Sequence, residues 1–246
     1  MGFLDHLEEL RKRIIWSLVS IAVGFCVCYF WHEAIFAWIQ KPIVTILSAH
    51  KMNTQLVYTN PVDPFNMYLK ISLIAGIFAA SPFILYQVWA FIAPGLYKYE
   101  RRYVGPFMVS TVGLFAAGGL FAYKEVYPAA LTFLVGYSLQ FNPMITINEY
   151  VGLFMTIVLG LGVIFEMPIL IFFLALFGIV SPGWMWRNLR YAILAIFIVA
   201  GAIAPTPDII SMCTFAAPMI VLYLLSIGVA YMVHPKQRKK REMNSQ

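Results

Sequence analysis

Long uninterrupted runs of apolar residues alternate with shorter polar stretches along this chain. The apolar runs cover residues 14–31, 66–93, 103–123, 150–177, 191–204 and 209–233. Their apolar residues are continuous and do not alternate with polar ones, as they would in a barrel strand. Because every backbone polar group in lipid needs an internal partner, such runs form helices. The pattern therefore predicts an all-α integral membrane protein with six transmembrane helices.

The polar stretches divide this single membrane domain into a leading helix, a bundle and a tail. Residues 1–13 are predicted to form an amphipathic helix, because leucines recur at three-residue spacing among charged neighbours. Residues 14–233 hold the six spans, and residues 234–246 form a basic tail. The polar stretches 32–66 and 124–149 are predicted to lie on the opposite side of the membrane from both termini. The first is predicted to form a folded cap with a short surface helix around Trp38.

The run 191–204 is shorter than a membrane requires. Its 14 residues reach about 21 Å as a helix, whereas the hydrocarbon core of a bilayer is about 30 Å thick. Either the bilayer thins or protein shields this helix, or the helix extends into its flanking residues. The sequence leaves these alternatives open.

Composition and charge place the chain in the membrane and orient it there. Hydrophobic residues make up 61% of the chain and charged residues only 11%, whereas soluble domains carry about 25% charged residues. The net charge is +6, and the basic residues stand mostly at the ends of the spans. There they determine how the protein is oriented in the membrane and contact anionic lipid, so binding to nucleic acid is not indicated. Thirteen of the 17 Lys and Arg residues fall within 11–13, 98–102, 187–190 and 236–241. The positive-inside rule therefore predicts a multi-pass inner-membrane protein with both termini in the cytoplasm.

The sequence disfavours enzymatic chemistry. All four histidines stand at or beyond the ends of spans, and no span contains an aspartate. Zinc-protease, serine-hydrolase, nucleotide-binding and dinucleotide-binding motifs are absent from the sequence. The three cysteines lie inside apolar runs without metal or redox spacing. We therefore expect no cofactor, no metal and no covalent catalysis.

Glu166 is the one acidic residue deep inside a predicted span. A carboxylate there is costly, so such residues usually face a cavity or a partner and can be protonated. The functional interpretation is a polar contact with a partner helix or a protonatable site. The alternative is an internal hydrogen bond, either to Gln87 or to backbone freed by Pro168.

Glu9 and Glu100 are candidates for a recognition site at the cytoplasmic side. Glu9 stands four residues before Arg13, so it can also form an ordinary surface pair along the helix. Glu100 has no cation four residues further on, and its alternative role is that of a helix-start carboxylate. Two carboxylates brought together at one membrane face would bind a pair of guanidinium groups well, because each accepts an arginine fork.

Four segments resemble the TatC family, the polytopic receptor subunits of the twin-arginine protein translocase. They are His-Leu-Glu-Glu-Leu-Arg-Lys-Arg at 6–13, Pro-Phe-Ile-Leu-Tyr-Gln-Val-Trp-Ala-Phe-Ile-Ala-Pro-Gly-Leu-Tyr at 82–97 followed by Glu-Arg-Arg at 100–102, Phe-Glu-Met-Pro at 165–168, and Pro-Thr-Pro-Asp at 205–208. The last departs from the more usual order, in which threonine precedes two prolines. In this order and over residues 6–231, the segments are specific.

This resemblance implies a glove-like, concave bundle of six helices that binds twin-arginine signal peptides of folded cargo. It implies proton-motive-force-driven transport without ATP, self-association within the complex, and single-span partner subunits of the TatA and TatB type. The residues implied for the signal-peptide site are Glu9 and Glu100, supported by Arg11, Arg13, Phe91, Pro94 and Arg101. Those implied for intramembrane polar contact with partners are Glu166 and Gln87, and those for the outer cap are Pro42, Asp63, Phe65 and Asp208. Asp208, beside two prolines, is also typical of a turn or helix cap.

Two other classes of function compete with a receptor. A proton-coupled small-solute transporter using Glu166 would depend on that residue and would tolerate loss of Glu100. Such transporters usually show repeats or broken helices in corresponding halves, and no convincing repeat is visible in this sequence. An intramembrane hydrolase would need a nucleophile and a base, for which the spans offer no plausible pair.

Overall fold

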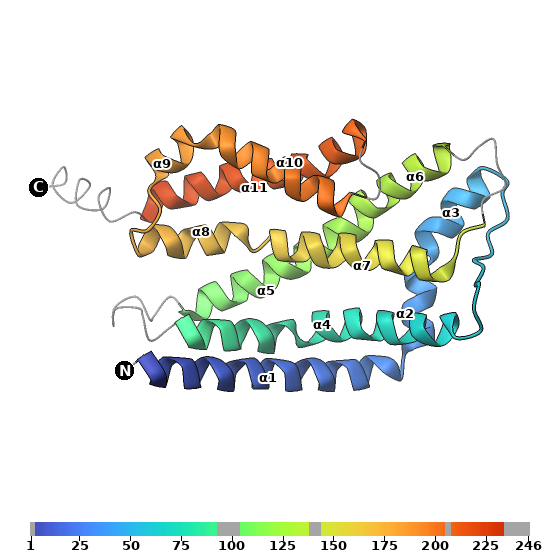
Figure 1. Cartoon of the computed structure of the whole chain (residues 1–246), viewed down its shortest axis with the longest axis horizontal. Helices are drawn as coiled ribbons and strands as arrows, with labels where there is room; N and C mark the ends of the chain where they lie inside the picture. The colour runs from blue at the N-terminus through green and yellow to red at the C-terminus, as the bar shows by residue number, and fades with distance from the viewer. Residues whose placement is uncertain (1–2, 93–103, 138–143, 205–207, 234–246) are drawn as a thin grey trace, which may run out of the picture.

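Helices make up nearly all of the regular structure in the computed structural model, which describes residues 3–92, 104–137, 144–204 and 208–233 (Figure 1). In chain order the elements are α1 (Phe3–Tyr29), α2 (His32–Ile39), α3 (Lys41–Ala49), α4 (Asp63–Ile92), α5 (Val104–Phe121), the π-helical turn η3 (Ala122–Val126), α6 (Tyr127–Tyr137), α7 (Ile147–Ile164), α8 (Met167–Leu176), α9 (Pro182–Arg187), α10 (Leu189–Ile203) and α11 (Ile209–Val233). The predicted all-α architecture is confirmed.

Five helical stretches within the described residues are long and apolar enough to cross a membrane. They are Asp5–Tyr29, Asp63–Phe91, Phe107–Gly136, Ile147–Leu176 and Ser211–Met232. The remaining predicted span corresponds to α10, whose 15 residues reach about 22 Å at 1.5 Å per residue. The helix thus starts only two residues before the predicted run, so extension into the flanks does not bring it to full membrane length.

The helices run back and forth along the long axis of the molecule, and their ends gather at two opposite ends (Figure 1). The start of α1 lies with the last turns of α4, α8 and α11 at what we call the terminal end. The helix α3, the end of α6 and the start of α7 lie at the opposite end, which we call the cap end. The start of α1 and the end of α11 therefore lie at the same end of the molecule.

The cap end contains the short helix that the sequence predicted around Trp38. This helix, α2, is followed at once by α3, and two tyrosines bind its last carbonyl groups. The Tyr123 hydroxyl donates to Trp38 O at 2.8 Å, and the Tyr150 hydroxyl donates to Ile39 O at 2.6 Å. Because the last carbonyls of a helix lack intrahelical partners, these hydroxyls join α2 to η3 and α7.

The prediction that residues 124–149 form a polar stretch between two spans is wrong for its first part, because the helix continues to Tyr137. Lys124 and Glu125 lie exposed on one side of this helix, while Val126 and Tyr127 are buried. Pro128 does not end the helix, because a π turn comes just before it and Tyr127 N–H bonds to Ala122 O, five residues back. The sequence analysis assigned this segment to a polar stretch between spans, whereas its buried face makes it part of the packed bundle.

A proline inside α4 is accommodated by its neighbour. Pro82 has no N–H and cannot bond to the Phe78 carbonyl one turn earlier. The Ser81 hydroxyl donates to Phe78 O instead, at 2.7 Å. The carbonyl therefore keeps a partner, as a lipid environment requires, and α4 continues to Ile92.

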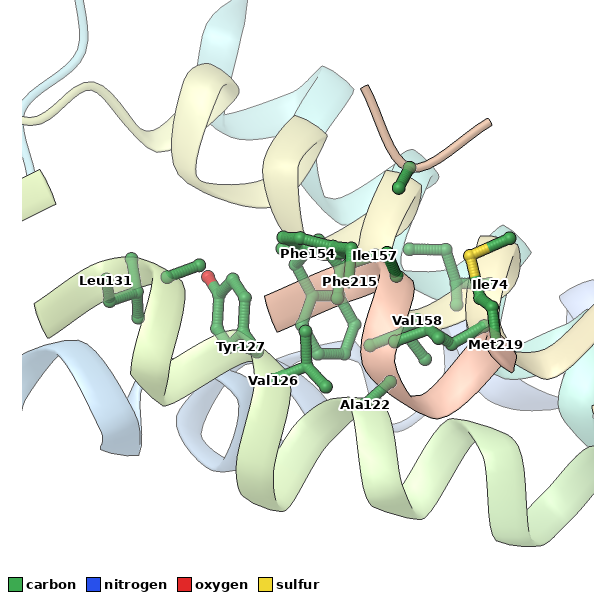
Figure 2. Packing of buried hydrophobic residues seen from close by; sticks show 14 of the residues in the cluster. Ile74, Ala122, Val126, Tyr127, Leu131, Phe154, Ile157, Val158, Phe215 and Met219 are labelled. Carbon is green, nitrogen blue, oxygen red and sulfur yellow. The ribbon is translucent and has the colours of Figure 1, made fainter. Parts of the chain in front are cut away.

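The main core lies mostly between α4, η3 with α6, α7 and α11, and buried residues of α2, α3, α8, α9 and α10 extend it. Figure 2 shows Ile74 of α4, Tyr127 of α6, Phe154 of α7 and Met219 of α11 among the side chains of this cluster. Tyr127 is completely buried, and its hydroxyl donates to Tyr150 O at 3.3 Å. The core thus fixes the positions of α4 and α7. The helix α4 carries Asp63 at the cap end and Gln87 near the terminal end, and α7 carries Asn148 at the cap end.

The helix α1 stands outside this core and packs along α4. The two backbones touch where Gly24 faces Gly76: an added Cβ on Gly76 would lie 2.6 Å from Phe25 N and 2.9 Å from Gly24 C. Neither atom can yield without moving a helix. This close approach sets the distance between α1 and α4 and hence the geometry of their polar residues at the terminal end.

Candidate functional site

Polar residues of α1 face α4 at the terminal end. Positions 6, 9 and 13 recur at three- and four-residue spacing, so they share one face of the helix. The His6 ring stacks on the Phe91 ring with centroids 4.4 Å apart and planes 17° apart. This contact holds the first turns of α1 beside the last turn of α4, and it places the predicted supporting residue Phe91 against α1.

Glu9, Arg13 and Gln87 form a hydrogen-bonded chain across the two helices. Arg13 Nη2 donates to Glu9 Oε1 at 3.3 Å, and Arg13 Nη1 donates to Gln87 Oε1 at 3.0 Å. The Arg13 side chain is 30% exposed and that of Glu9 is 19% exposed. The Glu9 carboxylate is therefore partly desolvated, which strengthens its attraction for a guanidinium relative to a fully hydrated surface pair.

These residues line a groove of about 490 Å³ at the terminal end. Its walls carry three carboxylates, two cations, one amide and one indole, from Asp5, Glu8, Glu9, Lys12, Arg13, Trp16 and Gln87. Apart from Gln87 of α4, all of them belong to α1. The arrangement can bind cationic groups through its carboxylates, while the indole offers a flat apolar wall for a guanidinium plane.

The other predicted residues of this site either do not line the groove or fall outside the described part of the chain. Arg11 is exposed and is not among the residues that line the groove. Glu100, Pro94 and Arg101 lie outside the described residues, so the predicted meeting of Glu9 and Glu100 remains a prediction.

Glu166 lies at the junction of α7 and α8, inside the fourth predicted span. The helix is interrupted there, and the Glu166 carbonyl accepts from Ile169 N and Leu170 N at 3.1 and 3.0 Å. Its carboxylate oxygen Oε1 is buried and has no hydrogen-bond partner among the described residues. Among the described residues, no hydrogen bond joins the Glu166 side chain to Gln87, whose Oε1 accepts from Arg13.

Asp63 is the most highly bonded acid at the cap end. It is only 6% exposed, and its Oδ2 accepts from Thr59 N, Asn60 N and the Thr59 hydroxyl at 3.1, 2.9 and 3.2 Å. Its Oδ1 accepts from Asn148 Nδ2 at 2.6 Å, and Lys70 Nζ donates to Asn148 Oδ1 at 3.2 Å. This network ties the start of α4 to the start of α7.

The other residues predicted for the outer cap make fewer contacts of this kind. Pro42 is half-buried in the first turn of α3, where a missing N–H costs nothing. Phe65 is exposed. Asp208 Oδ2 accepts from Ser211 N at 2.8 Å, which is the hydrogen bond of a helix-capping residue at the start of α11.

Sequence reasoning missed Asn148 and the pairing of Gln87 with Arg13. No local sequence pattern indicates either contact, because Arg13 and Gln87, like Asp63 and Asn148, are more than 70 residues apart in the chain. Within the described ranges, no group of three His, Cys, Asp or Glu side chains is placed to hold a metal ion. The acidic side chains of the groove and of the cap-end network thus lie at the two ends of the bundle, whereas Glu166 is half-buried within a span and has one buried carboxylate oxygen.

These features define a polytopic helical membrane protein with a charged groove at the end where the chain starts. The family model for Sec-independent protein translocase protein (TatC) matches residues 5–218. The TatC protein of Koribacter versatilis (strain Ellin345) is 68% identical over 241 residues, which are 98% of this chain and 89% of the relative. That of Carboxydothermus hydrogenoformans is 37% identical over 96% of each chain.

The fold comparison agrees with the sequence comparison. A crystal structure described as the twin-arginine translocase receptor TatC matches with a TM-score of 0.82 at 33% identity, covering 93% of this chain and 99% of that one. The chain belongs to the TatC family of Sec-independent protein translocase proteins. It is accordingly a protein-transport component and not an enzyme.

Proposed function

We propose that this chain is the receptor subunit of a twin-arginine protein translocase and binds the arginine pair of a signal peptide through Glu9 and Glu100. The observation that carries the proposal is the Glu9 carboxylate in the groove at the terminal end, where it already accepts a guanidinium at 3.3 Å. The name of the structurally similar receptor supports the same ligand class. The resemblance implies that Arg11, Arg13, Phe91, Pro94 and Arg101 support this site.

The proposed orientation places the groove in the cytoplasm. Six spans within residues 14–233 leave residues 1–13 and the basic tail 234–246 on the cytoplasmic side of the inner membrane. The distribution of Lys and Arg favours this orientation. Signal peptides of folded cargo would then meet the groove before they cross the membrane, as a receptor requires.

Arginine fits this groove better than lysine for a geometric reason. A guanidinium presents its N–H donors in a planar fork, so it can contact two acceptors at once, whereas an ammonium acts as a point charge. Glu9 and Gln87 already show this two-acceptor arrangement around one guanidinium. Partial burial of Glu9 adds to the preference, because a guanidinium is less strongly hydrated than an ammonium.

The proposed partners inside the membrane are single-span subunits of the TatA and TatB type, together with further copies of this chain. The buried Oε1 of Glu166, which has no hydrogen-bond partner among the described residues, supports a polar contact with a partner helix. The sequence contains no nucleotide-binding motif, which agrees with transport driven by the proton-motive force.

Binding of a synthetic twin-arginine signal peptide to membranes containing the protein tests this proposal. Glu9→Gln and Glu100→Gln should each weaken binding by about tenfold or more, since a charge-assisted hydrogen bond contributes about 1.5–3 kcal/mol. A twin-lysine peptide should bind more weakly to the parent. Glu166→Gln is the comparison variant, because it removes a carboxylate that does not line the groove. Unchanged binding in both groove variants, with loss of transport in Glu166→Gln, would favour the proton-coupled transporter instead.

A further inference from the structure

The Arg13 guanidinium lies between two acceptors of the groove. Its Nη1 and Nη2 point to acceptors on two different helices, Gln87 Oε1 at 3.0 Å and Glu9 Oε1 at 3.3 Å. Its Nε is buried and has no hydrogen-bond partner among the described residues. The side chain thus donates hydrogen bonds from two of its nitrogens to residues of the groove, while its third nitrogen, Nε, has no acceptor among the described residues.

These contacts define a small seat for a planar cation. One side of the seat is the Glu9 carboxylate, which supplies charge, and the other is the Gln87 amide oxygen, which supplies a neutral acceptor. A fork with donors on separate nitrogens reaches both acceptors at once, whereas an ammonium, whose donors share one nitrogen, matches this arrangement less well. The seat therefore selects arginine over lysine by geometry and not only by charge.

We propose that Arg13 holds this seat until a signal peptide arrives, and that an arginine of the peptide displaces it. The inference rests on the proposed function. It makes Gln87 a second ligand of the peptide guanidinium and hence a specificity-determining residue. It also makes Arg13 a competitor of the ligand, in contrast to the supporting role that the resemblance implies.

The exchange is energetically feasible because the internal pair is weak. Arg13 and Glu9 are four residues apart on one helix and are partly exposed, and ion pairs of this kind contribute little net stability, because solvent screens them and both side chains lose rotamer freedom. The unsatisfied Nε further lowers the cost of leaving. The displaced guanidinium stays close to Asp5 and Glu8, whose carboxylates also line the groove.

This arrangement reverses the sign expected for removal of Arg13. If Arg13 only supported the site, its loss would weaken peptide binding. If it competes for the seat, its loss frees Glu9 and Gln87 and strengthens binding of the twin-arginine peptide by roughly two- to fivefold, the range that a pair of this kind contributes. Binding of a twin-lysine peptide should gain less, so the preference for arginine should increase.

The experiment measures dissociation constants for twin-arginine and twin-lysine peptides with the full chain in lipid nanodiscs. The variants are Arg13→Met, which keeps an apolar stem of similar length, Arg13→Lys and Gln87→Leu. Arg187→Gln is the charge control, because Arg187 lies exposed on α9 at the same end of the molecule. Arg13→Met should bind the twin-arginine peptide more tightly, Arg13→Lys should lie between it and the parent, and Gln87→Leu should lose several-fold of the preference for arginine.

The outcomes separate this inference from the proposed function. Tighter binding in Arg13→Met but not in Arg187→Gln supports displacement. Weaker binding in Arg13→Met, with an unchanged melting temperature, would overturn it while leaving the receptor function in place. If the parent itself shows no preference for the twin-arginine peptide, the proposed function fails first. If Arg13→Met does not fold, the order of Arg13→Lys relative to the parent decides the question in the same way.

Discussion

The substitution Gly76→Val is expected to separate α1 from α4 and to prevent stable folding. The Cβ of any larger residue at this position would lie 2.6 Å from Phe25 N and 2.9 Å from Gly24 C, which are backbone atoms of the neighbouring helix. Overpacking typically costs about 1–3 kcal/mol even where side chains can move, and here a whole helix must shift. Since the groove is built by both helices, peptide binding should be lost together with stability.

Thermal unfolding in detergent, followed by near-ultraviolet circular dichroism, measures this effect. Gly76→Ala should lower the midpoint clearly, and Gly76→Val should leave too little folded protein to purify. Gly113→Ala is the matched control, because Gly113 lies inside α5 with no atom within 4 Å of an added Cβ. A Gly76→Val protein as stable as the parent would show that the close helix contact is not required.

The substitution Asp63→Ala is expected to open the cap end. It removes an acceptor of four hydrogen bonds from a residue that is 6% exposed, leaving the Asn148 amide and the Thr59 and Asn60 N–H groups without it. An unsatisfied buried group costs about 1–3 kcal/mol, and because Thr59 and Asn60 are exposed and water can replace Asp63 as their acceptor, we expect a loss of about 1–3 kcal/mol in total. The segment 50–62 and the start of α7 should then move more freely.

Limited proteolysis of segment 50–62, together with the melting temperature, checks this expectation. The melting temperature of Asp63→Asn should lie between those of the parent and Asp63→Ala. Its single amide oxygen can still accept either from Thr59 and Asn60 or from Asn148. Glu33→Gln is the control, since Glu33 is an exposed acid in the first turn of α2. Equal protease resistance in Asp63→Ala and Glu33→Gln would contradict a structural role for the network.

Most of the bundle could be predicted from the sequence because lipid imposes a simple rule on it. Continuous apolar runs must become helices, and the runs 66–93 and 209–233 match α4 and α11 closely. The prediction was wrong at 124–137, which was assigned to a polar stretch between spans but is helical and packs in the bundle. The π turn that carries the helix past Pro128 depends on tertiary packing of Val126 and Tyr127, which no local pattern reveals.

In the candidate site, too, contacts within one helix could be predicted from the sequence, whereas contacts between helices could not. The pairing of Glu9 with Arg13 follows from their four-residue spacing on one helix, and the structure contains it. The contact of Arg13 with Gln87 depends on how α1 sits beside α4, and this register is set by the Gly24–Gly76 approach. A lone glycine in an apolar run has many possible partners, so the sequence could not place Gln87 in the groove.

The most direct test of the receptor proposal is a double-mutant cycle between Glu9 and the signal peptide. Dissociation constants are measured for the parent and for Glu9→Gln, each with the twin-arginine peptide and with peptides in which one arginine is replaced by glutamine. Direct contact predicts a coupling energy of about 1 kcal/mol or more for one of the two arginines, and the same cycle with Glu100→Gln should couple to the other. Additive effects at both arginines would contradict the proposal that these carboxylates bind the arginine pair.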